Sequence, residues 1–421
     1  MKINNNSCCD FFKRIVIKIF EVADKFIFFN LDFKSASFSY IRRNLKDYQI
    51  KYLELKNKVF GDLPSVQNNR KLYQFSPSFM KGDGVGNLGV LLDKKHIKAG
   101  FKTKMFAVDF NGELYSNIYP ISEYKNDLGK NDIAILHFTG DSGVNDLAAN
   151  LNCEKWFYYH NVTPSDFFKN YDKDIYNLTL KGRDKLTLYK DKFDKSFTWS
   201  EYNYRELDKL GFKNIRLTAL PKDFNMLDIE IDREIFSRFD DGYFNIIFVG
   251  RILPYKNYKL LIDSFERFKS IYKINARLLL PGAPDDALYK KELDEYIRMN
   301  NIKNVEFFGR IEQSKLNALY KVSNIFLCVS GHEGYCMPII EAMYFELPVL
   351  ALDNGAVKET VAEGGIVLDS TADAEIIADN IYKIYSNSEL KNSIIKNQRE
   401  VLFNKYLMFS QFFKIRTRFS G

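Results

Sequence analysis

The stretch from Ser330 to Ala351, SGHEGYCMPIIEAMYFELPVLA, decides how the second half of this chain folds. It overlaps the end of an apolar run, IFLCVS, that is typical of a buried strand, and it continues through two glycines into a helix opened by Pro338. Proline is favoured in the first helical turn, because the N–H group that it lacks would be unpaired there anyway. The backbone amides of residues 334–337 are therefore predicted to meet at a helix N-terminus, which attracts anions.

Two carboxylates belong to the same stretch. Glu333 lies in the predicted loop and Glu341 follows eight positions later, in the first part of the predicted helix. Amide groups bind phosphate well, and carboxylates accept hydrogen bonds from hydroxyl groups. A bound nucleotide sugar would need this combination of groups. The working hypothesis is therefore that this stretch forms part of a nucleotide-sugar site.

Outward from this stretch, short apolar runs alternate with amphipathic segments from Lys71 to about residue 400. Such alternation predicts an α/β fold with parallel sheets covered by helices on both faces. We expect two doubly wound, Rossmann-like domains that face a cleft, and ligands at the carboxyl ends of their strands. The predicted strands are 71–77, 102–108, 133–139, 155–160, 195–200 and 215–220 in the first domain, and 244–250, 276–282, 305–309, 325–330, 348–352 and 364–368 in the second.

The boundaries follow from where this alternation stops. Residues 71–222 form the predicted N-terminal, acceptor-side domain, and residues 244–400 form the predicted C-terminal, nucleotide-sugar-binding domain. Between them, residues 223–243 carry several charges and no clear periodicity, which is typical of a linker. A last helix is predicted at about 401–421, where the chain could pack back on the N-terminal domain.

Charge and cysteine content exclude several classes of function. The formal net charge is +7, and residues 1–70, with thirteen basic and seven acidic residues, account for +6 of it. The remainder is nearly neutral, so nucleic-acid binding through a broad basic face is not expected. The five cysteines form neither a disulfide framework nor a zinc spacing, which favours a reducing, cytoplasmic setting. No acidic pair directly follows an apolar strand, and no metal is assigned.

Residues 1–70 form an N-terminal extension that is predicted to be helical. Its apolar part, DFFKRIVIKIFEVADKFIFF at 10–29, is interrupted after Asp10 by six further charges, too many for a membrane-spanning helix and unlike a signal peptide. An amphipathic helix remains, followed by a second, polar one. Residues 10–58 are expected either to contact an anionic membrane surface or to pack as a helical hairpin on protein, and the sequence leaves both open.

A glycine-rich loop, GDGVGNLG at 82–89, precedes the first predicted helix. Its Gly84, Gly86 and Gly89 fit the dinucleotide pattern G-x-G-x-x-G, with Asp109 twenty residues beyond the last glycine. The glycines do not follow the strand directly, however, which counts against a nicotinamide site. A turn that needs glycine, or a loop that approaches a substrate closely, are the competing interpretations.

The run FVGRILPYKN at 248–257 places two cations after a strand. Lys256 stands where the next helix is predicted to begin, and a cation there opposes the helix dipole. Arg251 and Lys256 would be well placed if both reached a bound pyrophosphate. A solvated pair of side chains is the alternative interpretation.

The run YYHNVTP at 158–164 ends an aromatic strand with His160. A single histidine is more often structural than catalytic, but the carboxyl end of a strand facing the predicted cleft favours a functional role. His137, in ILHFTG, has a similar position with weaker support.

Taken together, these residues resemble retaining glycosyltransferases of family 4, which have the GT-B fold. The 330–351 stretch resembles that family's E-x7-E motif, and FVGRILPYKN resembles its G-R-x4-K element. The resemblance implies that the catalytic residues are Glu333, His160, Arg251 and Lys256. It further implies a nucleotide-sugar-binding set of Gly84, Gly86, Asn87, Gly250, Gly282, Gly309, Arg310, Ile311, Gly334, Tyr335, Cys336, Met337 and Glu341.

The family resemblance also implies a reaction. A hexose-type sugar would pass from a nucleotide-diphosphate donor to a glycan or lipid-linked glycan, without a metal or other cofactor, in cell-surface polysaccharide synthesis. The expected location is the cytoplasm, or the periphery of the inner membrane face. Two alternatives remain: a sugar-nucleotide epimerase of the same architecture, and a non-catalytic protein that binds nucleotide sugars.

Overall fold

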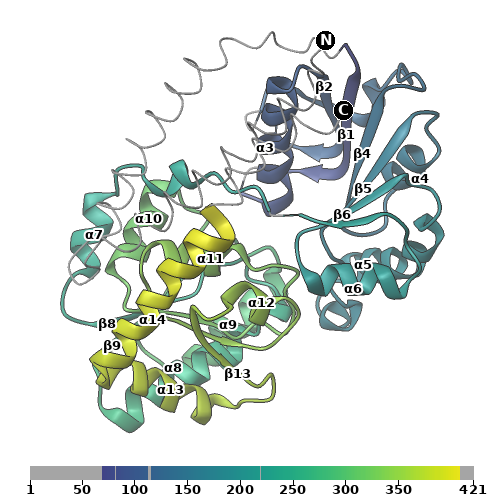
Figure 1. Ribbon diagram of the computed structural model, residues 1–421. Helices are drawn as coiled ribbons and strands as arrows, with labels where there is room; N and C mark the ends of the chain where they lie inside the picture. Colours follow the sequence, from purple (N-terminus) through teal and green to yellow (C-terminus); the bar gives the residue numbers. More distant parts are fainter. Residues whose placement is uncertain (1–68, 81, 112–114, 219, 408–421) are drawn as a thin grey trace, which may run out of the picture. The chain divides into compact units, whose positions relative to one another are not determined.

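The computed structural model describes residues 69–80, 82–111, 115–218 and 220–407 (Figure 1). These residues belong to one compact unit, residues 65–421, and residues 1–64 form another. The predicted helices of residues 10–58 and most of the predicted helix at 401–421 lie outside the described residues.

The first half of the described chain builds a seven-stranded sheet in which every neighbouring pair is parallel. Its strand order is β3-β2-β1-β4-β5-β6-β7. The strands are β1 (Lys71–Phe79), β2 (Lys102–Phe110), β3 (Ile118–Pro120), β4 (Ile133–Phe138), β5 (Glu154–Tyr159), β6 (Lys195–Thr198) and β7 (Ile215–Leu217). The helical segments between them are α3 (Gly84–Lys98), η1 (Ile121–Glu123), α4 (Gly143–Ala149), η2 (Ser165–Phe168), α5 (Lys173–Leu186), η3 (Thr187–Tyr189) and α6 (Glu201–Lys209).

Side-chain alternation along β1 and β4 sends neighbouring residues to opposite faces of this sheet. On one face, Tyr73 and Leu136 belong to a cluster with residues of α4 and α6. On the other face, Leu72 and Ile135 pack with Leu88 of α3. Helices therefore cover both faces, as Figure 1 shows for α3 and α4, and the predicted doubly wound architecture is confirmed for this half.

The second half builds a six-stranded parallel sheet of order β10-β9-β8-β11-β12-β13. Its strands are β8 (Phe244–Ile247), β9 (Ala276–Pro281), β10 (Val305–Gly309), β11 (Ile325–Cys328), β12 (Val349–Leu352) and β13 (Gly365–Leu368). The helices are η5 (Pro254–Lys256), α8 (Tyr258–Tyr272), α9 (Ala287–Met299), α10 (Gln313–Val322), α11 (Met337–Tyr344), α12 (Val357–Val361), α13 (Ala374–Ser386) and α14 (Ser388–Val401), with a π-helical segment η6 (Leu402–Leu407) at the end.

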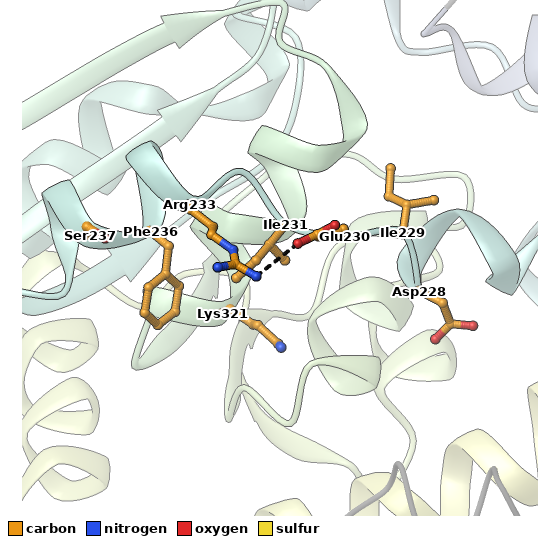
Figure 2. A pocket seen from close by; sticks show the side chains of 8 residues that line it. All are labelled: Asp228, Ile229, Glu230, Ile231, Arg233, Phe236, Ser237 and Lys321. Atoms are coloured by element: carbon orange, nitrogen blue, oxygen red, sulfur yellow. Dashed lines mark hydrogen bonds and ion pairs between the residues drawn. The ribbon is translucent and has the colours of Figure 1, made fainter.

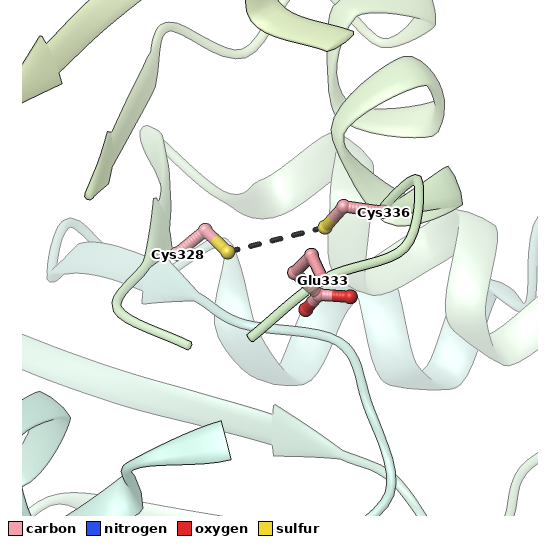
Figure 3. A group of neighbouring side chains, drawn as sticks. All are labelled: Cys328, Glu333 and Cys336. Carbon is pink, nitrogen blue, oxygen red and sulfur yellow. Dashed lines mark hydrogen bonds between the residues drawn. The ribbon is translucent and has the colours of Figure 1, made fainter. Parts of the chain in front are cut away.

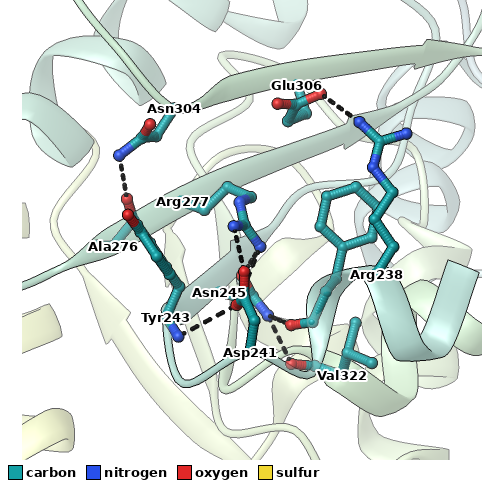
Figure 4. A network of polar contacts seen from close by, with 10 residues as sticks. Arg238, Asp241, Tyr243, Asn245, Ala276, Arg277, Asn304, Glu306 and Val322 are labelled. Carbon is teal, nitrogen blue, oxygen red and sulfur yellow. Dashed lines mark hydrogen bonds and ion pairs between the residues drawn. The ribbon is translucent and has the colours of Figure 1, made fainter.

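The segment predicted as a linker, residues 223–243, contains regular structure. It holds η4 (Phe224–Leu227) and the seven-residue helix α7 (Arg233–Phe239). A polar network ties the end of α7 to the second sheet (Figure 4). The Asn245 amide donates to the carbonyls of Phe239 and Val322, at 2.8 and 3.0 Å, and Arg277 pairs with Asp241 at 2.7 Å. The absence of a clear helical period in this segment fits a helix of only two turns.

The described end of the chain packs on the second half. The Tyr406 hydroxyl donates to the carbonyl of Thr360 at 2.8 Å, and the Lys405 ammonium bonds the carbonyl of Glu359. Among the described residues, no helix has both the length and the apolar character needed to span a bilayer.

Candidate functional site

The loop between β11 and α11 carries Glu333 on a tightly constrained backbone. The Ala356 amide donates to the Glu333 carbonyl at 2.8 Å. Gly355 has a φ of +66°, and a β-carbon there would lie 2.2 Å from that carbonyl oxygen. Glycine is therefore required at 355, because any side chain would push the loop away. At the far end of the loop, Cys336 precedes α11 in the left-handed conformation, with Met337 as the first helical residue.

The Glu333 carboxylate forms a buried ion pair with Lys256. Lys256 Nζ lies 2.6 Å from Glu333 Oε1, and the two side chains are 10% and 8% exposed. Lys256 ends η5, so the two predicted motifs meet in the structure. Burial by itself lowers the pKa of Lys256, but the Glu333 carboxylate and neighbouring groups reverse this effect and raise it. Lys256 is therefore cationic at neutral pH.

Arg251 follows Gly250, whose β-carbon would lie 3.6 Å from Lys256 Cε, and the Arg251 side chain is half exposed. Its Nη1 lies 3.5 Å from Asp285 Oδ2, a long and solvent-accessible ion pair. An exposed pair of this kind contributes little to stability, so the guanidinium is available to another anion at low cost.

Glu341, in α11, is held by two partners that the sequence did not point to. The Tyr320 hydroxyl donates to Oε2 at 2.9 Å, and Lys222 Nζ pairs with Oε1. Burial and the nearby carboxylate raise the pKa of Tyr320, so its hydroxyl keeps the proton that it donates. Glu341 is thus buried, fixed in orientation and charge-compensated.

Three predicted glycines lie at the carboxyl ends of neighbouring strands. Gly250 follows β8, Gly282 follows β9 and Gly309 ends β10. A β-carbon on Gly282 would lie 1.7 Å from the Gly250 carbonyl oxygen, and Gly309 has a φ of +64°. The Gly282 amide donates to the Gly309 carbonyl at 2.9 Å. These contacts require glycine for backbone packing, whatever the ligand.

Hydrogen bonds join the Glu333 loop to the first half of the chain. The Gly334 carbonyl accepts hydrogen bonds from Ser200 Oγ at 3.0 Å and Asn203 Nδ2 at 3.4 Å. His332 Nε2 lies 2.6 Å from Asn161 Oδ1. Because the Asn161 amide nitrogen donates to Asn203, its oxygen faces His332 and accepts that ring's proton.

His160 also comes close to this loop. A β-carbon on Gly334 would lie 3.1 Å from the His160 carbonyl oxygen, so the two backbones are in direct contact. His137 lies behind His160, with Nδ1 of His137 2.9 Å from Nε2 of His160. Burial lowers the pKa of His160 to about 3, which makes it a neutral side chain at ordinary pH.

The glycine-rich loop begins α3. Gly84 is the first helical residue, and the Asp83 side chain caps the helix by accepting from the Gly86 amide at 3.4 Å. A β-carbon on Gly86 would meet the Met80 carbonyl oxygen at 2.3 Å, whereas Gly84 faces open space. Asn87, in the same turn, is exposed.

Other predicted binding residues take less central positions. Arg310 is exposed and lies near Gly82, whose β-carbon would come 3.8 Å from its side chain, and Ile311 is half-buried. The Tyr335 ring packs against the Leu88 and Trp199 cluster of the first half.

One group of potential metal ligands occurs in the described part of the chain (Figure 3). It comprises Cys328, Glu333 and Cys336, all buried, with the two sulfur atoms 3.9 Å apart. The Lys256 ammonium already neutralises Glu333 there. The fit to a metal is poor, because a cation bound to Glu333 would have to displace Lys256, and we assign none.

A separate pocket of about 510 Å³ lies along the segment predicted as a linker (Figure 2). It is lined by Asp228, Ile229, Glu230, Ile231, Arg233, Phe236, Ser237 and Lys321. None of the predicted site residues lines it, so it is distinct from the candidate site.

Sequence reasoning missed Lys222, Tyr320, Asn161 and Asn203. Lys222 and Tyr320 are 119 and 21 positions from Glu341 and belong to no recognisable spacing. Asn161 offered one signal, since it follows His160 and has a φ of 75°, a conformation that asparagine tolerates better than most residues.

Part of this chain is similar in sequence to known glycosyltransferases. Residues 229–401 match the family model described as Glycosyl transferases group 1. An uncharacterised glycosyltransferase of Methanocaldococcus jannaschii is 24% identical over 232 residues, which is 54% of this chain and 60% of that protein. The 2-deoxystreptamine N-acetyl-D-glucosaminyltransferase of Niallia circulans is 23% identical over 270 residues, 62% of this chain and 66% of the relative. A lipopolysaccharide 1,2-N-acetylglucosaminetransferase of Salmonella typhimurium is 24% identical over 170 residues, 38% of this chain and 44% of the relative. The matches thus span less than two thirds of each relative.

Solved structures extend the likeness to both sheets. HepE of Anabaena, in complex with UDP-glucose, has a TM-score of 0.67 at 14% identity and covers 82% of this chain and 99% of its own. Sucrose-phosphate synthase of Thermosynechococcus elongatus has a TM-score of 0.65 at 16% identity, and the match covers 83% of this chain and 98% of the synthase. At such identities the likeness shows the fold alone, which is the two-sheet GT-B fold.

Proposed function

We propose that this chain, whose residues 229–401 match the glycosyl transferases group 1, transfers a sugar from a nucleotide-diphosphate donor to an acceptor glycan. The observation that carries the proposal is the buried Lys256–Glu333 pair, at the carboxyl ends of the strands of the second sheet, with Arg251 nearby. The complex of HepE with UDP-glucose, a protein of the same fold, supports a donor of this chemical class.

In this proposal the cations act on the leaving group. Negative charge grows on the diphosphate as the bond to the sugar breaks, and fixed positive groups in a site that excludes water stabilise that charge strongly. Lys256 is fixed by its ion pair, whereas Arg251 can leave Asp285 at little cost and turn toward the phosphates. Arg251 and Lys256 both offer N–H donors and positive charge to the phosphates, although Glu333 offsets the charge of Lys256, and we propose a metal-independent reaction.

The two carboxylates have different tasks. Glu333 Oε1 is bonded to Lys256, and the second oxygen remains for hydroxyl groups of the transferred sugar. Glu341, held by Tyr320 and Lys222, is proposed to accept hydrogen bonds from the ribose hydroxyls. We further propose that a hexose-type sugar is transferred with retention of configuration, the leaving phosphate helping to deprotonate the acceptor on the same face.

The relatives support a role in making surface glycans. One of them is named for lipopolysaccharide synthesis, and we propose a glycan or lipid-linked glycan as the acceptor here. The basic residues 10–58 are proposed to contact the anionic inner membrane face, where such acceptors would be met.

The decisive experiment compares Glu333→Ala with the intact chain in a transfer assay with UDP-, GDP-, ADP- and dTDP-sugars. Loss of a group that contacts the reacting sugar should lower the rate by about 100-fold or more. Glu346→Ala is the matched control, because Glu346 follows α11 but pairs with Arg399 away from the site. Unchanged transfer in Glu333→Ala would refute the proposed site. Product formation without an acceptor would instead favour an epimerase, and donor binding without product would favour a binding protein.

A further inference from the structure

A chain of hydrogen bonds runs through the first half of the molecule and ends at His160. Trp199 Nε1 lies 3.4 Å from His160 Nδ1, and His160 Nε2 lies 2.9 Å from His137 Nδ1. On the far side of the second ring, His137 Nε2 lies 2.8 Å from Gln74 Oε1. Every ring nitrogen of both histidines therefore faces a protein partner.

The amide of Gln74 fixes the proton at one end of this chain. Its nitrogen donates to the Gly89 carbonyl at 3.1 Å and to Asp93 Oδ1 at 3.3 Å, and both of these atoms are acceptors only. The amide oxygen must therefore face His137, and His137 Nε2 must carry the hydrogen that this oxygen accepts. Asn117 Nδ2 holds the other oxygen of Asp93 at 2.9 Å, which keeps the arrangement in place.

Trp199 fixes the proton at the opposite end independently. An indole N–H only donates, so His160 Nδ1 must be the bare nitrogen that accepts from it. His160 Nε2 then carries hydrogen and donates to the bare Nδ1 of His137. The two ends give the same assignment, and one additional proton would set two N–H groups against each other.

The surroundings favour the uncharged rings. His137 is fully buried, and its imidazole ring packs edge-to-face against the aromatic rings of Phe79 and Tyr158. The titratable groups that face the pair are Asp93 and His96 of α3 and Tyr158 of β5. Burial raises the pKa of Tyr158 far above neutrality, so it adds no charge, and the Asp93 carboxylate is taken up by Gln74 and Asn117.

We propose that Gln74, His137 and Trp199 are positioning residues that lock His160 in the neutral tautomer with hydrogen on Nε2. In consequence, His160 has no ring nitrogen left for a substrate and takes no part in proton transfer. It borders the site through its backbone, which touches Gly334. Gly89 and Asp93 belong to α3, which begins at Gly84, so the same network sets the position of the glycine-rich loop relative to His160.

The tautomers can be read directly by NMR of the full chain with isotope-labelled histidine. The chain has four histidines, and a His137→Phe variant identifies one of the pair by its missing signal. We expect both His137 and His160 to carry hydrogen on Nε2. Both rings should stay neutral from about pH 8 down to about pH 5, a lower limit that is well below the ordinary histidine pKa. Hydrogen on Nδ1 of either ring, or protonation of either ring above about pH 5.5, would overturn the proposal.

A nearly isosteric variant tests the consequence for activity, which rests on the proposed function. Gln74→Glu places a carboxylate against His137, so an imidazolium becomes favourable and the pKa of His137 should rise to about 7, slightly above the ordinary histidine value. Transfer by this variant should fall about 10-fold or more between pH 8 and pH 6, with a new acidic limb in its pH profile, whereas the parent chain shows none.

Gln398→Glu is the matched control. Gln398 is fully buried in the second half, and its amide donates to the Leu347 carbonyl, away from His137 and His160. The substitution should cost stability without adding a limb to the pH profile. If Gln74→Glu does not fold, Trp199→Phe combined with Gln74→Met removes the fixed partner at both ends of the chain, and a mixture of His160 tautomers is expected. A parent-like tautomer in that variant, or a parent-like profile in a folded Gln74→Glu, would refute the positioning role. Absence of transfer by the parent chain would refute the proposed function and leave the NMR result to decide the tautomer.

Discussion

The lysine and the carboxylate at the centre of the site are charged, buried and only 2.6 Å apart. Each of them is costly to bury alone, because a charge that leaves water loses its hydration. Together they offset much of that cost, and a phosphate group can later share Lys256. The same pair therefore stabilises this part of the fold and, under the proposed function, holds a cation for the diphosphate of the donor.

A double-mutant cycle measures this coupling. Lys256→Met and Glu333→Gln should each lower the free energy of unfolding by about 3–5 kcal/mol, since each leaves a buried group without its partner. The double variant should lose less than the sum. Urea unfolding at neutral pH gives the values, and the more exposed Arg399–Glu346 pair serves for comparison, with an expected coupling of at most about 1 kcal/mol. Additive losses at Lys256 and Glu333 would contradict the coupling.

Single residues of the site differ in how well sequence predicts them. Glu333 lies in a loop and Glu341 in a helix, as the sequence predicted, and Lys256 ends the short helix η5 just before α8. Lys222 could not be predicted, because its pairing with Glu341 depends on the packing of a segment outside both sheets. For His160 the position was predicted, but its bonding was not, since the partners come from β1, β4 and the residue after β6.

Among the helices, α6 depends on a residue from the other half of the chain. The Glu359 carboxylate of α12 accepts hydrogen bonds from the amides of Glu201 and Tyr202, at 2.7 and 3.3 Å. These amides open α6 and have no partner within the helix. A negative charge there also compensates the positive end of the helix dipole. The contact links α6, whose cap Ser200 binds Gly334, to the sheet that carries Glu333.

Replacing this carboxylate tests the link. Glu359→Gln keeps the size of the side chain and removes the charge, and it should destabilise the chain by about 1 kcal/mol at low salt, with a smaller effect at high salt. Glu363→Gln is the control, since Glu363 is exposed beyond the end of α12. Equal effects of the two substitutions, or an effect of Glu359→Gln that does not respond to salt, would exclude the helix-terminal role.

Strands were predicted better than the short elements. Most predicted apolar runs became strands, because a buried parallel strand needs a continuous apolar sequence. The three residues of β3 were missed, since so short a run, ending in Pro120, has no pattern of its own. α3 begins at Gly84, inside the stretch 82–89 that was predicted as a loop, because the Asp83 cap outweighs the poor helical propensity of two glycines.

At the scale of the whole molecule, all four histidines are held neutral by burial. Burial lowers the pKa of His96 and His332 to about 4 and that of His160 to about 3, and it lowers the pKa of His137 well below the ordinary value. The unfolded chain binds these protons near the ordinary value of 6.5. Above that pH neither state is protonated, and stability is complete. As the pH falls below it, only the unfolded state gains protons, and stability is lost.

Acid should therefore unfold this protein steeply. Four protons taken up only by the unfolded state give a slope of up to about 5 kcal/mol per pH unit between about pH 6 and about pH 4. Urea unfolding at a series of pH values measures the slope, and His96→Gln should reduce it by about a quarter. Stability that does not change between about pH 7 and about pH 5 would show that the histidines are protonated in the native state.

The chain contains two tryptophans, Trp156 in β5 and Trp199 after β6, and both belong to the first sheet. Intrinsic tryptophan emission therefore reports on one half of the molecule, and Trp199 emits from beside His160, at a ring distance of 6.2 Å. Far-ultraviolet circular dichroism reports on both halves. Followed together during unfolding, the two signals reveal whether the second half melts with the first half or separately, without any label being attached.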